Sequence, residues 1–175
     1  MAHASLDTPS DWVVRWAALV TRGPVLDLAS GSGRHARLFA ARALEVIAVD
    51  REEQAISGVR FVKADLEDGS PWPFSGQSFG AIVVTNYLHR PLLPLLAQSL
   101  HEGGVLIYET FMVGNEKFGK PSNPAFLLRP GELLAAFGAL TVVAFEQGTL
   151  ERPKKAAVQR ICVIRGNAEG VRIPA

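Results

Sequence analysis

The chain has 175 residues, of which 48% are hydrophobic and 20% are charged, and its formal net charge is +1. This composition predicts one ordered domain over residues 1–175 rather than a disordered chain. The near-neutral charge gives no electrostatic reason to expect wrapping of nucleic acid, and the longest apolar runs are too short to span a bilayer. Because no basic segment followed by an apolar core opens the sequence, we expect a soluble, cytoplasmic protein.

The expected secondary structure alternates between helices and strands. Residues 11–21 have the pattern of an amphipathic helix, with Ser10 as its cap and Trp12 and Trp16 on its apolar face. Strands are expected at residues 25–28, 44–49, 59–64, 79–85 and 105–110, helices at 34–42, 91–100 and 130–137, at most two helical turns within 51–57, and loops at 66–78 and 111–129.

The C-terminal part of the chain departs from this alternation. Gly103 and Gly104 are expected to end a helix before the fifth strand. Residues 141–146 and 158–165 are expected to form two further strands without an intervening helix, which predicts antiparallel pairing. We therefore predict an α/β fold, with a doubly wound, mostly parallel, seven-stranded Rossmann-like sheet and a C-terminal antiparallel hairpin.

The most informative segment is VLDLASGSGRHARLFAARALEVIAVD, at residues 25–50. Glycine is needed at Gly31 and Gly33 because the backbone there must adopt conformations that a Cβ penalises, and because a ligand must approach the main chain. Asp50 ends the second strand, where its carboxylate can accept hydrogen bonds from two ribose hydroxyls. Together these features predict an adenosine-containing ligand at the carboxyl ends of the strands.

Two cofactor classes satisfy this pattern. Gly31, Gly33 and Ala36 nominally match the dinucleotide fingerprint, with an acidic residue at a plausible distance. Asp27 discriminates between the classes, because its carboxylate would oppose a pyrophosphate and would instead favour an ammonium or sulfonium group. Asp65, at the end of the third strand, adds another carboxylate to the same edge.

The segment VLDLASGSGRHA, followed by Asp50, resembles the first motif of class I S-adenosylmethionine-dependent methyltransferases. The G-x-G-R form of the turn and the sequence DLEDGSPWPFSGQSFGAIVVTNYLHR are most similar to small bacterial members of the tellurite-resistance and ubiquinone-biosynthesis-like type. The resemblance covers most of the chain. One departure is Ala29, where the family usually has a glycine, so the turn must tolerate a methyl group.

The resemblance implies S-adenosylmethionine as the cofactor and S-adenosylhomocysteine as the product. It implies that Asp27 orders the loop near the amino-acid end of the cofactor, that Asp50 holds the ribose, and that Asp65 accepts a hydrogen bond from the adenine amino group. The residues expected at the cofactor are Asp27, Ala29, Gly31, Gly33, Arg34, Asp50, Arg51, Asp65, Leu66, Thr85 and Asn86.

The expected reaction is direct in-line displacement of the methyl group by an unidentified acceptor, in which alignment supplies much of the rate. His89 is the candidate general base if the acceptor needs one, and a capping or surface role is its alternative. The loop at residues 109–130 is expected to cover the acceptor. The residues expected to contact the acceptor are Tyr87, Tyr108, Glu109, Phe111, Phe118 and Arg129.

A small-molecule acceptor is expected first, with nucleic acid or protein acceptors left open, no membrane partner, and a monomer or homodimer. Two other functions stay open: a cofactor-binding, non-catalytic partner subunit, whose first helix could offer its tryptophans to an interface, and a small NAD(P)-dependent oxidoreductase. The four histidines have no metal-ligand spacing with one another or with Cys162, so no metal is expected. Cys162 is expected to be a buried, reduced thiol.

Overall fold

Our computed structural model describes residues 7–175, so residues 1–6 of the expected domain lie outside it. Its strands are β1 (Val25–Leu28), β2 (Val46–Asp50), β3 (Arg60–Lys63), β4 (Phe79–Thr85), β5 (Leu100–Phe111), β6 (Thr141–Leu150) and β7 (Ala156–Ile164). Its α-helices are α1 (Asp11–Trp16), α2 (Arg34–Ala40), α3 (Leu93–Gln98) and α4 (Glu132–Phe137). Short 3-10 helices lie at Ala17–Leu19, Arg90–Leu92, Asn115–Lys117 and Pro124–Phe126.

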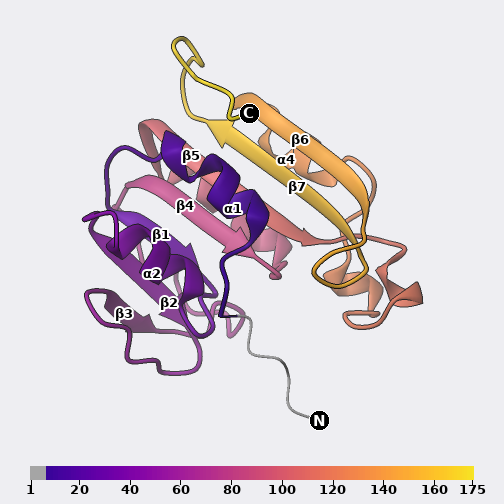
Figure 1. Cartoon of the computed structure of the whole chain (residues 1–175). Coiled ribbons are helices and arrows are strands. Elements are labelled where there is room, and N and C mark those ends of the chain that lie inside the picture. Colours follow the sequence, from indigo (N-terminus) through magenta and orange to yellow (C-terminus); the bar gives the residue numbers. More distant parts are fainter. Residues whose placement is uncertain (1–6) are drawn as a thin grey trace.

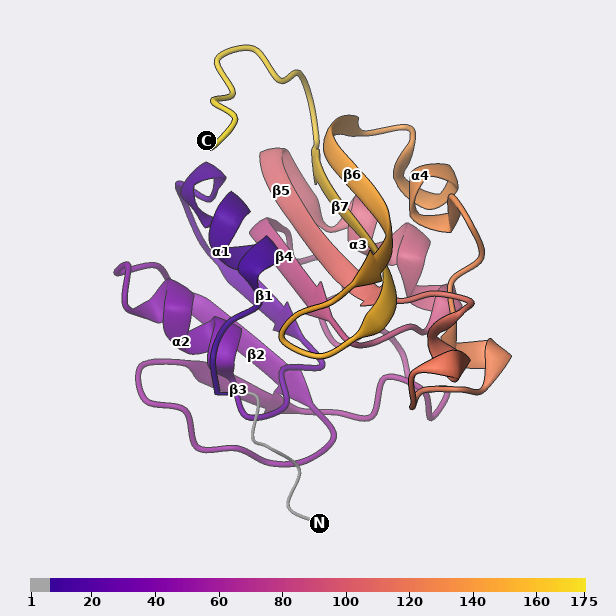
Figure 2. The same ribbon diagram turned by 45° about the vertical axis from the view of Figure 1, so that its right-hand side comes forward.

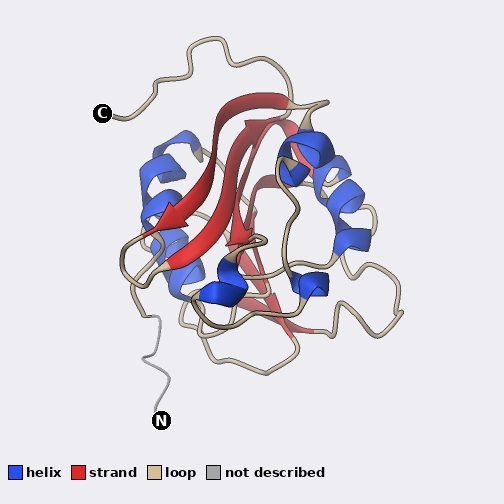
Figure 3. Ribbon diagram, turned by 90° about the vertical axis from the view of Figure 1, so that its right-hand side faces the viewer, coloured by secondary structure: helices blue, strands red, loops and turns tan. Residues whose placement is uncertain are grey.

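The seven strands form one sheet in the order β3-β2-β1-β4-β5-β7-β6. Strands β1 to β5 pair in parallel, and β7 pairs antiparallel with both β5 and β6. As Figures 1 and 3 show, α1 and α2 cover one face of the sheet, and α3 and α4 cover the other. The predicted doubly wound α/β sheet with a C-terminal antiparallel hairpin is therefore confirmed.

The first helix packs its apolar face against the sheet. Ser10 caps it as predicted, since its Oγ accepts a hydrogen bond from the backbone N–H of Trp12 at 3.2 Å. Trp12 and Trp16 are each 1% exposed, and the Trp12 indole donates to the carbonyl of Ile161 at 3.2 Å. The expectation that these tryptophans could form an interface is wrong, because the sheet already covers them.

The helical turns expected within residues 51–57 do not form in the structure. The Asp50 carboxylate accepts a hydrogen bond from the backbone N–H of Glu52 at 3.0 Å. Such a side-chain bond gives the backbone an alternative to helical hydrogen bonding and favours a turn. Only Ile56 in this segment is buried, so an amphipathic helix would gain little from packing here.

The fifth strand is longer than predicted, because the helix before it ends at Gln98 rather than at the two glycines. β5 begins at Leu100 and runs through Gly103 and Gly104. Gly103 has a φ of +79°, and a Cβ on Gly104 would lie 2.8 Å from the carbonyl oxygen of His101. These glycines therefore permit an irregular strand, next to the register shift between β4 and β5, and do not end a helix.

The parallel strands all end at the same edge of the sheet, on the lower side of the view in Figure 1. Figure 2 shows that the segment after β5, with its two 3-10 helices, lies at this edge as well. An isolated bridge between Met112 and Leu128 closes the base of that segment. The edge therefore brings together the turns after β1 to β4 and the long segment between β5 and α4.

Candidate active site

A cleft of about 490 Å³ opens at this edge, beside the ends of β1 to β4. Its volume is in the usual range for a small-molecule or cofactor site. The residues predicted for the cofactor that line it are Ala29, Asp50, Arg51, Asp65, Leu66 and Asn86, and Tyr87, predicted for the acceptor, lines it too. Three further lining residues, Glu52, Ala64 and Glu67, were not predicted.

The turn after β1 has the left-handed backbone conformation at three positions, with φ of +52° at Ala29, +52° at Gly31 and +81° at Gly33. Ala29 adopts it despite its methyl group, a conformation that strains a residue with a side chain by about 1 kcal/mol. At Gly33 a Cβ would also lie 2.3 Å from the side chain of Ile56. The predicted need for glycine is met at Gly31 and Gly33, which do not themselves line the cleft.

Asp50 is fixed by two backbone groups on opposite sides of its carboxylate. One carboxylate oxygen accepts from the N–H of Gly31 at 2.8 Å, and the other accepts from the N–H of Glu52 at 3.0 Å. Each oxygen has further acceptor capacity. The glycine turn therefore orients the carboxylate at the cleft, where it can still accept hydrogen bonds from a ligand.

The end of β3 repeats part of this arrangement. The Asp65 carboxylate accepts from the backbone N–H of Glu67 at 2.9 Å, as Asp50 does from that of Glu52. Both strands thus continue into an acid-x-acid turn that places a second carboxylate at the cleft. The sequence signal for Glu52 and Glu67 was this repeated spacing, Asp-Arg-Glu and Asp-Leu-Glu, after two neighbouring strands.

The far wall of the cleft is formed by the residues after β4. Asn86 has a φ of +54°, and its N–H donates to the carbonyl of Glu109 at 2.9 Å. The carbonyl of Tyr87 accepts from the hydroxyl of the buried Tyr108 at 2.7 Å. Burial and the neighbouring Glu67 carboxylate raise the pKa of the Tyr87 phenol above its usual value. These contacts tie the wall of the cleft to β5.

Several solved structures share the fold. TehB from Haemophilus influenzae matches with a TM-score of 0.73 and 15% identity over 91% of this chain, which spans 63% of the TehB chain. A 1,6-didemethyltoxoflavin-N1-methyltransferase from Burkholderia thailandensis matches with a TM-score of 0.66 and 18% identity, over 94% of this chain and 80% of its own. The glycopeptide N-methyltransferase MtfA matches with a TM-score of 0.61 and 16% identity, over 93% of this chain and 96% of its own.

A comparison with curated proteins gave no match. Residues 25–104, a little under half of the chain, match the family model described as a methyltransferase domain. The match begins at β1 and ends within β5, so it contains every turn that lines the cleft. This part of the chain is similar to a methyltransferase domain. The resemblance noted in its glycine turn is thereby supported.

Asp27 lies beneath the turn and does not line the cleft. It is 2% exposed, and its carboxylate accepts from the backbone N–H of Ala36 at the start of α2, at 2.8 Å. Burial raises the pKa of Asp27 to about 7, although the Ala36 hydrogen bond and the charge of Arg34 act in the opposite direction. Asp27 therefore ties the turn to α2 from inside the fold.

A polar group of side chains joins the N-terminal segment to the ends of α2 and β4. Arg34 donates to the carbonyl of Thr8 at 2.9 Å, and the backbone N–H of Ser10 donates to Nε2 of His35 at 3.0 Å. Nε2 is therefore unprotonated, which leaves Nδ1 to carry the proton 3.4 Å from the hydroxyl of Thr85. Burial lowers the pKa of His35 to about 3, so the ring is neutral at physiological pH. Arg34 and Thr85 do not line the cleft.

Of the residues predicted for the acceptor, only Tyr87 lines the cleft. Tyr108 is buried, Glu109 forms an ion pair with Arg160 at 3.2 Å, and Phe111 is half-buried at the end of β5. Two others belong to the segment after β5: Phe118 lies beneath the Lys155 ammonium at 5.4 Å, and the exposed Arg129 pairs with Glu132 at 3.6 Å.

The candidate base His89 lies at the beginning of the 3-10 helix Arg90–Leu92, three residues after Asn86. It is half-buried, its side chain makes no capping hydrogen bond, and it does not line the cleft. The next residue, Arg90, donates to the carbonyls of Ala125 and Leu127 and to the Glu132 carboxylate. The segment that carries His89 is therefore held against the loop expected to cover the acceptor.

Cys162 is buried in the sheet, and burial raises the pKa of its thiol to about 12, as expected of an unreactive cysteine.

Among residues 7–175 no cluster of three or more acidic, histidine or cysteine side chains could hold a metal ion. Within the same residues, no helix has the length and apolar character needed to cross a membrane.

Proposed function

We propose that the methyltransferase domain binds S-adenosylmethionine in the cleft and transfers its methyl group to a small-molecule acceptor by direct in-line displacement. The observation that carries this proposal is the Asp50 carboxylate, which the N–H groups of Gly31 and Glu52 orient at the cleft. A carboxylate held in this way can accept hydrogen bonds from two vicinal ribose hydroxyls. Such a pair is part of an adenosine cofactor.

Two of the structures that share the fold support this choice of ligand. The toxoflavin methyltransferase was crystallised with S-adenosylhomocysteine, and MtfA was crystallised with sinefungin. In this chain Asp65 and Leu66 lie beside Asp50 in the cleft, where they offer an acceptor for the adenine amino group and an apolar contact for its ring. Asn86 and Tyr87 close the other wall.

When bound, S-adenosylmethionine would supply a methyl group attached to a positively charged sulfur. After transfer of the methyl group, that sulfur would be the neutral thioether of S-adenosylhomocysteine. The chain's own contribution is to hold the reacting atoms in line and to exclude water, which together supply much of the rate. A hydroxyl acceptor would also need a base for its proton, and His89, three residues beyond Asn86, is the residue we assign to that role. Thiol and amine acceptors can react without one.

The two alternatives lack comparable support. A dinucleotide could also use Asp50 for a ribose, but the two ligand-bound structures described above hold S-adenosylhomocysteine and sinefungin. A non-catalytic partner subunit would need a surface for its partner, and the helix considered for that purpose buries its tryptophans. Methyl transfer is the function that the cleft supports best.

Calorimetric titration with S-adenosylhomocysteine and, separately, with NADH tests the proposal. We expect the native protein to bind S-adenosylhomocysteine and not NADH, and Asp50→Ala to weaken binding by about 100-fold, since two charge-assisted hydrogen bonds are lost. Asp68→Ala is the matched control, because Asp68 caps a turn in the same way at 2.8 Å but does not line the cleft. Binding of NADH alone, or no loss with Asp50→Ala, would overturn the proposal.

A further inference from the structure

The cleft is strongly acidic although the chain as a whole is nearly neutral. Its lining includes four carboxylates, from Asp50, Glu52, Asp65 and Glu67, against the single guanidinium of Arg51. Asp50 and Asp65 are oriented by the turns that they cap. The other two carboxylates have no role in holding these turns, since only their backbone N–H groups are used.

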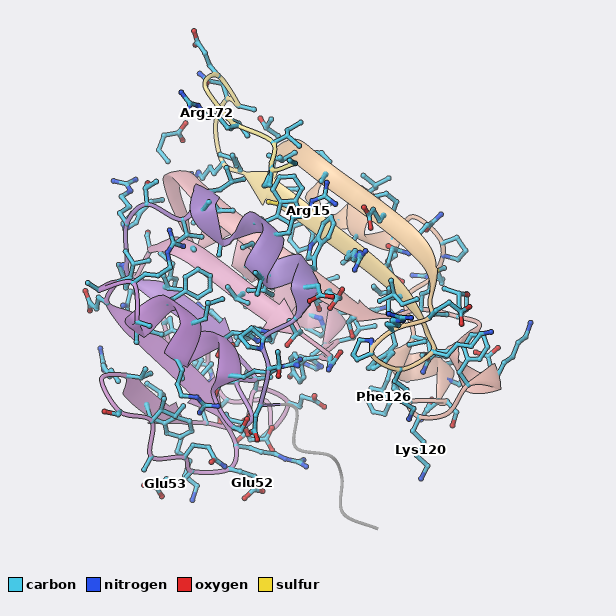
Figure 4. The ribbon with its side chains drawn as sticks, in the orientation of Figure 1. Arg15, Glu52, Glu53, Lys120, Phe126 and Arg172 are labelled. Atoms are coloured by element: carbon cyan, nitrogen blue, oxygen red, sulfur yellow. The ribbon has the colours of Figure 1, made fainter. Side chains whose placement is uncertain are left out.

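Glu52 and Glu67 are exposed, and neither forms an ion pair in the described part of the chain. Glu53 provides a contrast, because it lies outside the cleft lining and pairs with Lys63 at 4.0 Å. Figure 4 shows Glu52 and Glu53 as neighbours on the lower side of the molecule. The carboxylates of Glu52 and Glu67 therefore have no ion-pair partner among the described residues, whereas that of Glu53 has one.

We propose that Glu52 and Glu67 are specificity-determining residues that make the cleft prefer the positively charged methyl donor over the uncharged product. This inference rests on the proposed function. Donor and product share the adenosine and the amino acid, and they differ only by a methyl group and the charge of the sulfur. Hydrogen bonds to the shared atoms stabilise both complexes alike. The electrostatic field of the carboxylates at the cleft stabilises the charged sulfur of the donor and has no such effect on the uncharged product.

The size of the effect follows from Coulomb's law. One carboxylate about 8 Å from a unit positive charge in water changes a dissociation constant by about two-fold at low ionic strength. Two such carboxylates together change the ratio of the two affinities by about four-fold. The Debye length falls from about 30 Å at 0.01 M salt to about 3 Å at 1 M, so high salt should abolish the preference. The preference would lessen inhibition by accumulated product.

The Glu67 carboxylate also acts on the Tyr87 phenol, whose pKa its charge helps to raise. Loss of this interaction would alter the wall of the cleft and thus the binding of both ligands. A ratio of affinities removes such a shared effect and retains only the part that depends on ligand charge. The ratio is therefore the quantity to measure.

The experiment is calorimetric titration of the full chain with S-adenosylmethionine, S-adenosylhomocysteine and sinefungin, whose additional amine replaces the sulfonium charge. For the native protein, the ratio of the S-adenosylhomocysteine Kd to the Kd of either cationic ligand should fall at least about four-fold between about 0.01 M and 1 M salt, because salt also screens Asp50 and Asp65. Glu52→Gln combined with Glu67→Gln should lower the ratio about four-fold at low salt. Glu53→Gln, which removes a carboxylate outside the cleft lining, should lower it by less than about two-fold.

Three results would overturn the inference. The ratio could stay constant with salt and in the double variant while all ligands bind, which leaves the proposed function standing. Glu53→Gln could lower the ratio as much as the double variant, which would assign the effect to surface charge in general. Failure of the native protein to bind any of the three ligands would remove the proposed function and this inference together.

Discussion

The two halves of the sheet's carboxyl-end edge use their polar side chains differently. After β2 and β3, Asp50 and Asp65 accept hydrogen bonds from neighbouring backbone N–H groups and face a cleft. At the end of β5, Glu109 instead accepts from the hydroxyl of Ser10 and pairs with Arg160. Polar side chains in the first half are left available to a ligand, and those in the second half satisfy one another.

Gln159 is the clearest example in the second half. It is fully buried in β7, accepts from the backbone N–H of Leu133 at 2.8 Å, and donates to the carbonyl of Arg129 and to Gln147. Buried polar groups satisfied in this way stabilise one arrangement of the fold. We infer that the second half supports the site, whereas ligand recognition belongs to the first.

The largest effect on stability should come from Asp27, whose carboxylate belongs to the first half of the edge but is buried inside the fold. Because its pKa rises from 3.8 to about 7 on folding, the folded protein keeps a proton that the unfolded chain releases near pH 4. The free energy of unfolding therefore loses a contribution of roughly 4 kcal/mol as the pH rises from about 4 to 7. Asp27→Asn keeps an oxygen for the Ala36 N–H and should abolish this loss.

Urea unfolding at pH 5 and pH 8 measures the contribution of Asp27 to the free energy of unfolding. His35, whose folded pKa is about 3, contributes the opposite slope below about pH 6.5, so the variant must be compared with the native protein at each pH. The free energy of unfolding of Asp27→Asn, minus that of the native protein, should be larger at pH 8 than at pH 5. An equal difference at both would show that Asp27 is ionised throughout.

The fold was largely predictable because buried strands and glycine turns are local patterns. The boundary of β5 was not, since Gly103 and Gly104 stop a helix and permit a strand irregularity equally well. Asp50 was identified from its position after a buried strand. Glu109, also at a strand end, was expected at the acceptor, but its partner Arg160 lies 51 residues away in the sequence, and no local pattern indicates such a pair.

The next largest effect on stability should come from the ion pair between Glu109 and Arg160. Arg160 donates to Glu109 and to Glu146, and its guanidinium lies 4.8 Å from the centre of the Trp12 ring. Arg160→Ala should lower the free energy of unfolding by about 2 kcal/mol, because Glu109 would keep a mostly buried charge without its cation. Arg15→Ala removes a more exposed cation, 3.8 Å from Glu146, and should cost less than about 0.5 kcal/mol.

Both variants should leave the affinity for S-adenosylhomocysteine within about two-fold of the native value, as the second half is not expected to contact the cofactor. Chemical denaturation and calorimetry on the same preparations give the two quantities. A large loss of affinity with Arg160→Ala, at native-like stability, would place the ligand in the second half and would break the distinction between the two halves.

The location of the cofactor is the central claim, and amide hydrogen exchange with and without S-adenosylhomocysteine tests it most directly. Exchange should slow at residues 29–33, 50–52, 64–67 and 86–87, which form the glycine turn and the rest of the cleft. The hairpin at residues 146–158 should show no change. Protection confined to that hairpin, or absent from the turns after β1 to β3 while the ligand is bound, would contradict the account.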